Sequence, residues 1–378
     1  MAKALRGNDI SLQKKMASFA KRYIACRDDL YYMDYFPDDI WSSMGKENLL
    51  GLSLPVEYGG LGGDYLSIVV AGEALVRQGH NMGIAMSWLT HLAVSRFLIG
   101  SYGDNRQKNT YLSRLACGRI TVSIAVSEPG RGAHPKHLET SAYRRGEFYV
   151  LNGEKSYLTN GPIADLFIVI ASTGFEGGRK RYTAFFVSQD TVGLSKTEPM
   201  KFDFFKPSPH GGIILSNCSV PVTEILGEEG FAYEKMVKPF RDLEDALKMG
   251  LLVGGMERQV EILFHLMGKQ GISLTNELKE DLGRMRSIID TIRILAYEGA
   301  SMFDSTVKEP ELPSLLISGR SLSKKFQDNF RLFIKKAGID EDTDMHLFTN
   351  DLVHGINMGE KIARIKQKKL GESLLKGI

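Results

Sequence analysis

The spacing of hydrophobic residues changes twice along the chain, and these changes divide it into three regions. From about residue 10 to 118, apolar residues recur at helical spacing. Ser11 stands at the start of this region and is of a residue type that caps helices, so we expect the first helix to begin there. After a glycine-rich break at residues 55–65, further helices are predicted at residues 66–80, 86–100 and 103–116.

From Arg119 to about Gly227 the period of the pattern becomes two, as in β-strands. Runs of β-branched and aromatic residues are separated by Gly, Pro and Asn. Residues 144–155 have the order of a strand, a turn and a second strand. Several short antiparallel strands in a segment of this length are typical of a β-sandwich or a β-barrel.

Helical periodicity returns after residue 228. A long and largely apolar run has the character of a helix buried in a bundle, and three amphipathic runs follow it, at residues 277–303, 317–338 and 351–370. We therefore expect an α+β protein of three domains. They are an N-terminal all-α domain at residues 1–118, a middle antiparallel β domain at residues 119–228, and a C-terminal four-helix bundle at residues 229–378.

Composition narrows the class of protein. With 43% hydrophobic and 25% charged residues, the 378-residue chain can bury a sizeable core. Its 48 Lys and Arg against 45 Asp and Glu leave a net charge of +3, which is too balanced to indicate nucleic acid as a partner. Three distant cysteines without a CxxC pair disfavour a disulfide framework and a zinc site. We expect a cytoplasmic protein with no secretory signal, no membrane span and no metal.

The most informative order of residues lies between positions 125 and 165. By composition, this segment is two β-hairpins with turn glycines. Its order resembles the middle domain of the acyl-CoA dehydrogenase family, where T-E-P-G-x-G-S-D precedes L-N-G-x-K-x-W-I-T-N. Here SEPGRGAH (residues 127–134) and LNGEKSYLTNG (residues 151–161) stand at matching spacing. LGLSLPVEYGGLGG (residues 50–63) and NCSVPVTEILGEEG (residues 217–230) are similar to two other motifs of that family.

The resemblance implies an FAD site in the middle domain. On the family's pattern, backbone groups of Ile124 and Val126 bind the edge of the isoalloxazine ring, and the Ser127 hydroxyl bonds its pyrimidine carbonyl. Thr159 donates a hydrogen bond to N5, the atom that receives the hydride, and Tyr157 packs against the ring where Trp is usual. Ser for Thr and Tyr for Trp keep the hydroxyl and the aromatic ring that these roles need.

Two departures from the family's pattern concern ligand binding. Ala133 takes the place of the Ser that touches the pantetheine arm of the CoA thioester, so Ala133 marks the substrate-binding position, and His134 replaces the following Asp. In the bundle, Gln270 stands where the family has an Arg on the flavin pyrophosphate, with Lys269 beside it. A lysine can supply the charge there but not the bidentate fork of Arg.

The general base is the third departure. The dipeptide Asn-Met at residues 357–358 replaces Tyr-Glu of the family's C-terminal Y-E-G-T motif, and YEGA at residues 297–300 lies too early in the chain to serve as that motif. Some branches of the family carry the base on the long helix instead. There, alignment back from LLVGG gives Glu244 and alignment forward from LGEEG gives Asp242. We expect Glu244 to remove the α-proton as hydride leaves the β-carbon. Alternatively, residues 241–248 are a charged first turn that favours the helix dipole.

Three functional hypotheses follow from these motifs. The first is an acyl-CoA dehydrogenase-like flavoprotein of fatty acid metabolism, which oxidises the CH–CH group of an acyl thioester and passes electrons to an electron-transfer flavoprotein. The second keeps the flavin but uses a carrier-protein-linked or non-CoA substrate, because Ala133 and His134 alter the CoA contacts. The third is a degenerate, non-catalytic interaction subunit. The resemblance also implies a homodimer or homotetramer.

Overall fold

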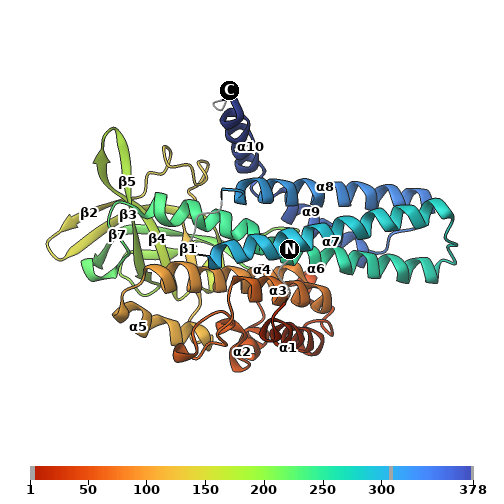
Figure 1. Ribbon diagram of the computed structural model, residues 1–378. Coiled ribbons are helices and arrows are strands. Elements are labelled where there is room, and N and C mark those ends of the chain that lie inside the picture. Colours follow the sequence, from red (N-terminus) through yellow and green to blue (C-terminus); the bar gives the residue numbers. More distant parts are fainter. Residues whose placement is uncertain (1–4, 306–309, 376–378) are drawn as a thin grey trace. The chain divides into compact units, whose positions relative to one another are not determined.

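The computed structural model describes residues 5–305 and 310–375 (Figure 1). Contacts between residues divide the protein into two compact units, each assembled from separate stretches of sequence. The first unit comprises Met1–Tyr31, Asp64–Ala85 and Asp245–Ile378, and the second comprises Tyr32–Gly63 and Met86–Glu244. The three-domain boundaries at residues 118 and 228 follow the sequence pattern rather than these contacts, and they stay predictions.

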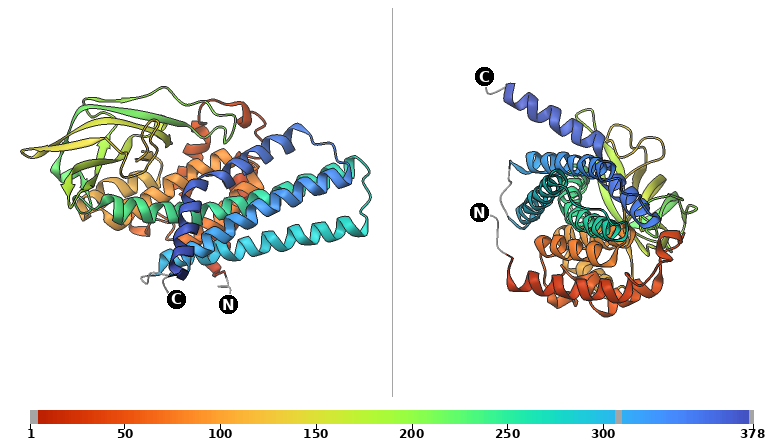
Figure 2. Two further views of the ribbon diagram at one scale, coloured as in Figure 1. Left: turned by 90° about the horizontal axis from the view of Figure 1, so that it is seen from above. Right: turned by 90° about the vertical axis from the view of Figure 1, so that its right-hand side faces the viewer.

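The first unit is helical, as the apolar spacing predicts. Its long helices α6, α7 and α8 run side by side (Figure 2). Gln259 of α6 and Gln327 of α8 exchange side-chain amide hydrogen bonds of 2.8 and 3.3 Å in the buried interior between them. The helices of this unit are α1 (Gly7–Tyr23), α3 (Tyr65–Gly79), α7 (Asn276–Asp304), α8 (Leu312–Ala337), α9 (Thr343–Asn357), α10 (Glu360–Leu375) and, from Asp245 onward, α6 (Lys238–Lys269).

The predicted start of the first helix is wrong. Helix α1 begins at Gly7, so Ser11 lies inside its first turns. The reason is the buried Asp9 carboxylate, which accepts the backbone N–H of Arg6 at 3.0 Å and a hydroxyl hydrogen bond from Ser67 at 2.7 Å. Asp9 lies in the first turn and its side chain binds the backbone of Arg6, the residue before the helix, as in a capping box. The sequence pattern shows only an acidic residue near the start.

The amphipathic run at residues 351–370 forms two helices rather than the single helix predicted. Helix α9 ends at Asn357 and α10 begins at Glu360. Gly359 between them has a φ of +76°, a left-handed conformation that glycine adopts without steric cost. The chain changes direction here, so residues 357–358 and Glu360 do not share a helix.

The second unit joins short helices to a β domain. Its helices are α2 (Asp38–Lys46), α5 (Asn105–Ala116) and, from Met86 onward, α4 (Met82–Ala93), which continues as a π-helical stretch over Val94–Gly100. Met82–Gly100 has the length and hydropathy of a membrane span, but 89% of that window is buried within the structure. The core helix of a soluble protein has the same properties, so this stretch is weak evidence for a span.

Eight strands form one mixed sheet in the order β6-β7-β3-β2-β4-β5-β8, with β1 beside β4. Most neighbours are antiparallel, as predicted, but β1 pairs with β4 in parallel and β2 meets β4 in parallel at a single pair of residues. The strands are β1 (Val122–Ala125), β2 (Ser141–Arg145), β3 (Phe148–Thr159), β4 (Leu166–Glu176), β5 (Arg179–Ser188), β6 (Leu194–Lys196), β7 (His210–Pro221) and β8 (Ile225–Leu226).

The predicted strand–turn–strand at residues 144–155 is confirmed. Strands β2 and β3 are antiparallel, with Arg145 opposite Phe148 and only two residues between them. One of these is Gly146, whose φ of +62° suits a tight hairpin. The hairpin leads into β3, the strand that carries two of the predicted site residues.

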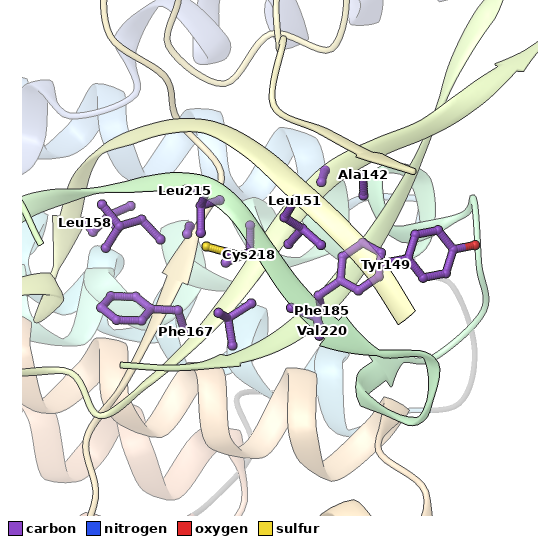
Figure 3. Close-up of a cluster of buried hydrophobic side chains, with 14 of the residues drawn as sticks. Ala142, Tyr149, Leu151, Leu158, Phe167, Phe185, Leu215, Cys218 and Val220 are labelled. Atoms are coloured by element: carbon purple, nitrogen blue, oxygen red, sulfur yellow. The ribbon is translucent and has the colours of Figure 1, made fainter. Parts of the chain in front are cut away.

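The core of the β domain lies on the inner face of the sheet. Alternate residues of the strands project into it, and Figure 3 shows Phe167, Phe185, Leu215 and Cys218 among them. Leu158 of β3 belongs to the same cluster and is only 2% exposed. Because side chains alternate along a strand, the residues on either side of Leu158 are directed away from this core.

Candidate active site

The five residues expected to bind the flavin ring lie on two adjacent segments of the second unit. They are Ile124 in β1, Val126 and Ser127 just after it, and Tyr157 and Thr159 in the last residues of β3. The Ser123 hydroxyl donates to the Thr159 carbonyl at 2.7 Å. The Ser156 N–H donates to the Ser127 carbonyl at 2.9 Å. These two hydrogen bonds bring the segment that follows β1 next to the end of β3, although the two are about thirty positions apart in sequence; we call this shared border of the two segments an edge.

A buried ion pair holds the two segments together. Lys155 has no exposed side-chain surface, and its ammonium lies 2.9 Å from Glu128 Oε1 and 3.1 Å from the Val126 carbonyl. The Glu128 carboxylate also accepts the backbone N–H groups of Glu139 (2.7 Å) and Thr140 (2.9 Å). Burial lowers the pKa of Lys155 to about 8, while Glu128 opposes this effect. This pair was not predicted from the sequence, although both residues lie in the quoted motifs.

Tyr157 has an unusual backbone conformation. Its φ is +60°, in the left-handed region that non-glycine residues rarely adopt, and it lies where the register of β3 against β7 shifts. Its side chain is 60% exposed although it is aromatic. A strained backbone that presents a large ring to the outside is typical of ligand sites, where the strain is maintained by the surrounding structure.

Thr159 has a partner that the sequence did not reveal. Its hydroxyl lies 3.1 Å from Nε2 of His210, the first residue of β7, and the two residues are paired in the sheet. Nδ1 of His210 lies 3.1 Å from the Ser208 carbonyl. Burial lowers the pKa of His210, and the contact with Ser208 offsets this only in part. Burial therefore favours the neutral form of this imidazole.

The loop that carries Ala133 and His134 is fastened through its backbone. The Ala133 carbonyl accepts hydrogen bonds from the Arg241 guanidinium (2.6 Å) and the Tyr233 hydroxyl (2.9 Å), and the Tyr182 hydroxyl donates to the Pro135 carbonyl. His134 itself is exposed. Sequence analysis did not identify Arg241, because its contact is with a backbone carbonyl distant in sequence.

The expected base lies in the first half of α6. Glu244 and its alternative Asp242 are both half-buried. Arg241 and Glu244 are three residues apart in the helix, so their side chains occupy neighbouring positions on one face. Arg241 binds the carbonyl of Ala133, the residue predicted to contact the substrate, so the predicted base lies one helical turn from a residue that contacts this loop.

Asp245, the residue after the predicted base, has a structural role. Its Oδ1 lies 3.3 Å from Arg320 and 3.4 Å from Lys248, and its Oδ2 lies 3.4 Å from Lys366. Burial alone raises the pKa of the Asp245 carboxyl, but these three cations outweigh burial and hold the pKa below its usual value. Asp245 thus stays ionised and paired, which makes it a poor proton acceptor.

Two other sequence features also make structural contacts. The Gln270 side chain donates to the Asp340 carbonyl at 2.8 Å and accepts the Asp340 N–H at 3.0 Å. Within YEGA, the Tyr297 hydroxyl donates to Glu73 at 3.1 Å and Glu298 is exposed on α7. Among residues 5–305 and 310–375, no group of three His, Cys, Asp or Glu side chains could hold a metal ion.

Comparison with known proteins gives the family. The profile of the acyl-CoA dehydrogenase N-terminal domain matches residues 8–119, and that of the acyl-CoA dehydrogenase middle domain matches residues 123–218. The chain belongs to the acyl-CoA dehydrogenase family. The family profiles cover the loop and strand residues described above, together with the helices that precede them.

Individual relatives differ in the substrates that their names state. Mitochondrial isovaleryl-CoA dehydrogenase of Solanum tuberosum is 34% identical over 58% of this chain and 53% of its own length. L-prolyl-[peptidyl-carrier protein] dehydrogenase of Pseudomonas fluorescens is 32% identical over 66% of each chain. The matched part thus spans between half and two thirds of these relatives. A glutaryl-CoA dehydrogenase from Mycobacterium smegmatis, solved in complex with FADH2, has the same fold, with a TM-score of 0.83 at 21% identity over 98% of this chain and 95% of its own.

Proposed function

We propose that this protein is an FAD-dependent oxidoreductase that introduces a double bond between the α- and β-carbons of an acyl thioester. The observation that carries the proposal is the shared edge on which Ser127, Tyr157 and Thr159 lie together. Membership of the acyl-CoA dehydrogenase family and a relative of the same fold that binds FADH2 support the choice of cofactor.

The groups at this edge fit an isoalloxazine ring. Ser127 and Thr159 offer hydroxyls for its polar atoms, and the exposed ring of Tyr157 offers an apolar face. Backbone groups of Ile124 and Val126 would complete the contacts, and the buried pair of Lys155 with Glu128 keeps the two segments in place. When bound, FAD supplies the two-electron acceptor.

Glu244 would act as the base. Its carboxylate would take the proton from the α-carbon, and the electron pair of that C–H bond becomes the new C=C bond as hydride leaves the β-carbon. The loop that carries Ala133 would position the thioester. Electrons would then pass to an electron-transfer flavoprotein. We also propose that the protein is cytoplasmic and forms homodimers or homotetramers.

The first test is the visible spectrum of the purified protein with added FAD, followed by anaerobic titration with isovaleryl-CoA and butyryl-CoA. We expect a flavin spectrum that bleaches with a thioester. Glu244→Gln should slow this reduction at least a hundredfold, whereas Asp242→Asn, its neighbour in the same helix, should change it little. The reverse pattern would assign the base to Asp242. A protein that stays colourless with FAD would instead indicate a non-catalytic interaction subunit.

A second candidate keeps the chemistry but uses a carrier-protein thioester. It is favoured by Ala133, which has no hydroxyl for the pantetheine arm and whose carbonyl is already occupied by Arg241 and Tyr233. The relative named for an L-prolyl-carrier substrate also supports it. Comparing the rate of flavin reduction by one acyl group on CoA and on a carrier protein will separate the two candidates.

A further inference from the structure

The loop between β1 and β2 contains a tight turn with the sequence His-Pro-Lys-His. The His137 N–H donates to the His134 carbonyl at 2.9 Å, and Pro135 occupies the second position, where its fixed φ favours such a turn. The Tyr182 hydroxyl donates to the Pro135 carbonyl and thereby fastens the turn to β5. His134, Lys136 and His137 are exposed, so the turn presents three basic side chains at the surface.

His134 and Lys136 keep hydrogen-bond donors that the chain does not use. Nδ1 of His134 accepts the Lys136 N–H at 3.3 Å, so the proton of the neutral imidazole lies on Nε2. The His137 ring lies beside it, and the two ring centroids are 4.9 Å apart. Within residues 5–305 and 310–375, neither Nε2 of His134 nor the Lys136 ammonium donates to another residue. Both donors are therefore available to a ligand.

Four basic side chains at this turn lack a carboxylate partner in the described part of the chain. They are His134, Lys136, His137 and, on α6, Arg241, which we call the basic cluster. By contrast, Arg131 on the same loop is paired with Glu139. Slight burial and the charges of the other three members lower the pKa of His134, because like charges disfavour its protonation. An anion bound at the cluster would relieve this repulsion.

We propose that the basic cluster binds the phosphate of a phosphopantetheine arm. This inference rests on the function proposed above, because the arm carries the acyl thioester. Three members of the cluster follow shortly after Ala133, the residue predicted to contact the arm. His134 replaces an Asp of the family's pattern, whose negative charge would repel a phosphate. Imidazole, ammonium and guanidinium groups all donate charge-assisted hydrogen bonds to phosphate oxygens.

The expected effect is modest because the cluster is exposed. An exposed ion pair changes an equilibrium constant by less than about fivefold. The double variant His134→Gln with Lys136→Gln removes two members and leaves Arg241 with its loop contact in place. We therefore expect this variant to lower kcat/KM for a phosphate-bearing thioester about tenfold.

The test compares three isovaleryl thioesters, those of pantetheine, 4′-phosphopantetheine and CoA, with an excess of an artificial electron acceptor. In the double variant, kcat/KM should fall about tenfold for the second and third thioesters, and less than twofold for pantetheine, which has no phosphate. A matched control is Arg131→Gln, which removes a cation of the same loop that is already paired and should change all three values less than twofold. Equal losses for pantetheine and phosphopantetheine, or no loss for phosphopantetheine, would overturn the proposal.

The same phosphate occurs in two kinds of substrate, and an isovaleryl carrier protein distinguishes them. In CoA the phosphate leads into the nucleotide, and in a carrier protein it joins the arm to a serine. Equal losses with both substrates in the double variant would show that the cluster serves both sources. A loss with only one of them would identify that one as the source.

A binding measurement separates this inference from the proposed function. Nitrogen-15 NMR follows the ring nitrogens of His134 and His137 while 4′-phosphopantetheine is added to the wild-type protein, with pantetheine as the control. Shifts with only the phosphorylated compound support the cluster even if no thioester reduces the flavin, in which case the proposed function alone fails. Flavin reduction by thioesters without such shifts leaves the proposed function intact and overturns the cluster.

Discussion

Replacing Lys155 by Met tests the part of the structure on which the proposed site depends most. The ammonium of Lys155 is fully buried and pairs with Glu128, whose side chain is 5% exposed. Met fills a similar volume but leaves the Glu128 carboxylate without its counter-charge. Since Val126 and Ser127 follow β1 directly before Glu128, loss of the pair should loosen the predicted flavin-binding segment as well as the fold.

The magnitude follows from what remains around Glu128. Removing one partner of a buried ion pair typically costs about 3–5 kcal/mol of stability. Here the carboxylate keeps two charge-assisted hydrogen bonds, from the N–H groups of Glu139 and Thr140. We therefore expect Lys155→Met to lower the free energy of unfolding by about 3 kcal/mol, at the lower end of that range.

Urea unfolding followed by circular dichroism gives this free energy, and an FAD titration of the same samples gives the effect on the site. A matched control is Lys180→Met. Lys180 is half-buried and donates to the Leu138 carbonyl at 2.6 Å on the same loop, and it forms no ion pair with any residue in the described part of the chain. Losing this hydrogen bond to a neutral carbonyl should lower the free energy of unfolding by about 1 kcal/mol. FAD affinity should fall in Lys155→Met and change little in Lys180→Met.

A second substitution, at Glu128, separates the effect of losing the ion pair from the effect of changing side-chain packing. In the double variant Lys155→Met with Glu128→Gln the buried charge is gone, and the amide oxygen of Gln can still accept the Thr140 N–H. The double variant should be more stable than the sum of the single effects predicts, by about 1–3 kcal/mol. Strict additivity, or a loss below 1 kcal/mol in Lys155→Met, would show that the reasoning about this pair is wrong.

Two further predictions concern stability. Burial lowers the pKa of His91 to about 4, only partly offset by the Leu115 carbonyl. In the unfolded chain the His91 imidazole takes up a proton near pH 6.5, so the free energy of unfolding should decrease by about 3 kcal/mol as the pH falls from 6.5 to 4. Urea unfolding across this range should show a smaller decrease in this free energy for His91→Phe. Tyr157→Gly should leave stability within about 1 kcal/mol, since relief of the left-handed φ offsets the flexibility gained, while FAD binding weakens. The comparably exposed Tyr143→Gly, within β2, should destabilise instead.

The elements of the fold were largely predictable because each is either amphipathic or continuously apolar over its own length. Strands β3, β4, β5 and β7 and all the long helices match runs whose period the sequence shows directly. The wrong predictions concern helix boundaries that are determined by one contact with a distant residue or by one glycine. A buried carboxylate at Asp9 moves the start of α1 away from Ser11, and Gly359 breaks a run that is amphipathic on both sides.

The site was predictable only in part, for a related reason. Ser127, Tyr157 and Thr159 were predicted as flavin-binding residues because their motifs stand in a fixed order, and that role stays a prediction. The structure brings the segment of Ser127 next to the end of β3, which carries the other two. His210 lies 51 residues from Thr159 and reaches it through the pairing of β3 with β7, which no local pattern specifies. Arg241 likewise acts on a backbone carbonyl, which any residue at position 133 would provide.

Gln270, which departs from the family's pattern, and Asp245, which follows the predicted base, both make structural contacts in the first unit. The Gln270 side chain connects the end of α6 to Asp340 by a hydrogen bond. The Asp245 carboxylate forms ion pairs with three cations, which belong to α6, α8 and α10. The residues predicted to bind the flavin ring carry the hydroxyls and the aromatic ring that this role needs, and the buried pair of Lys155 with Glu128 lies beside them. We therefore propose that the substrate and the far end of the cofactor are held differently in this chain, while the hydroxyls and the aromatic ring of the predicted flavin site are present.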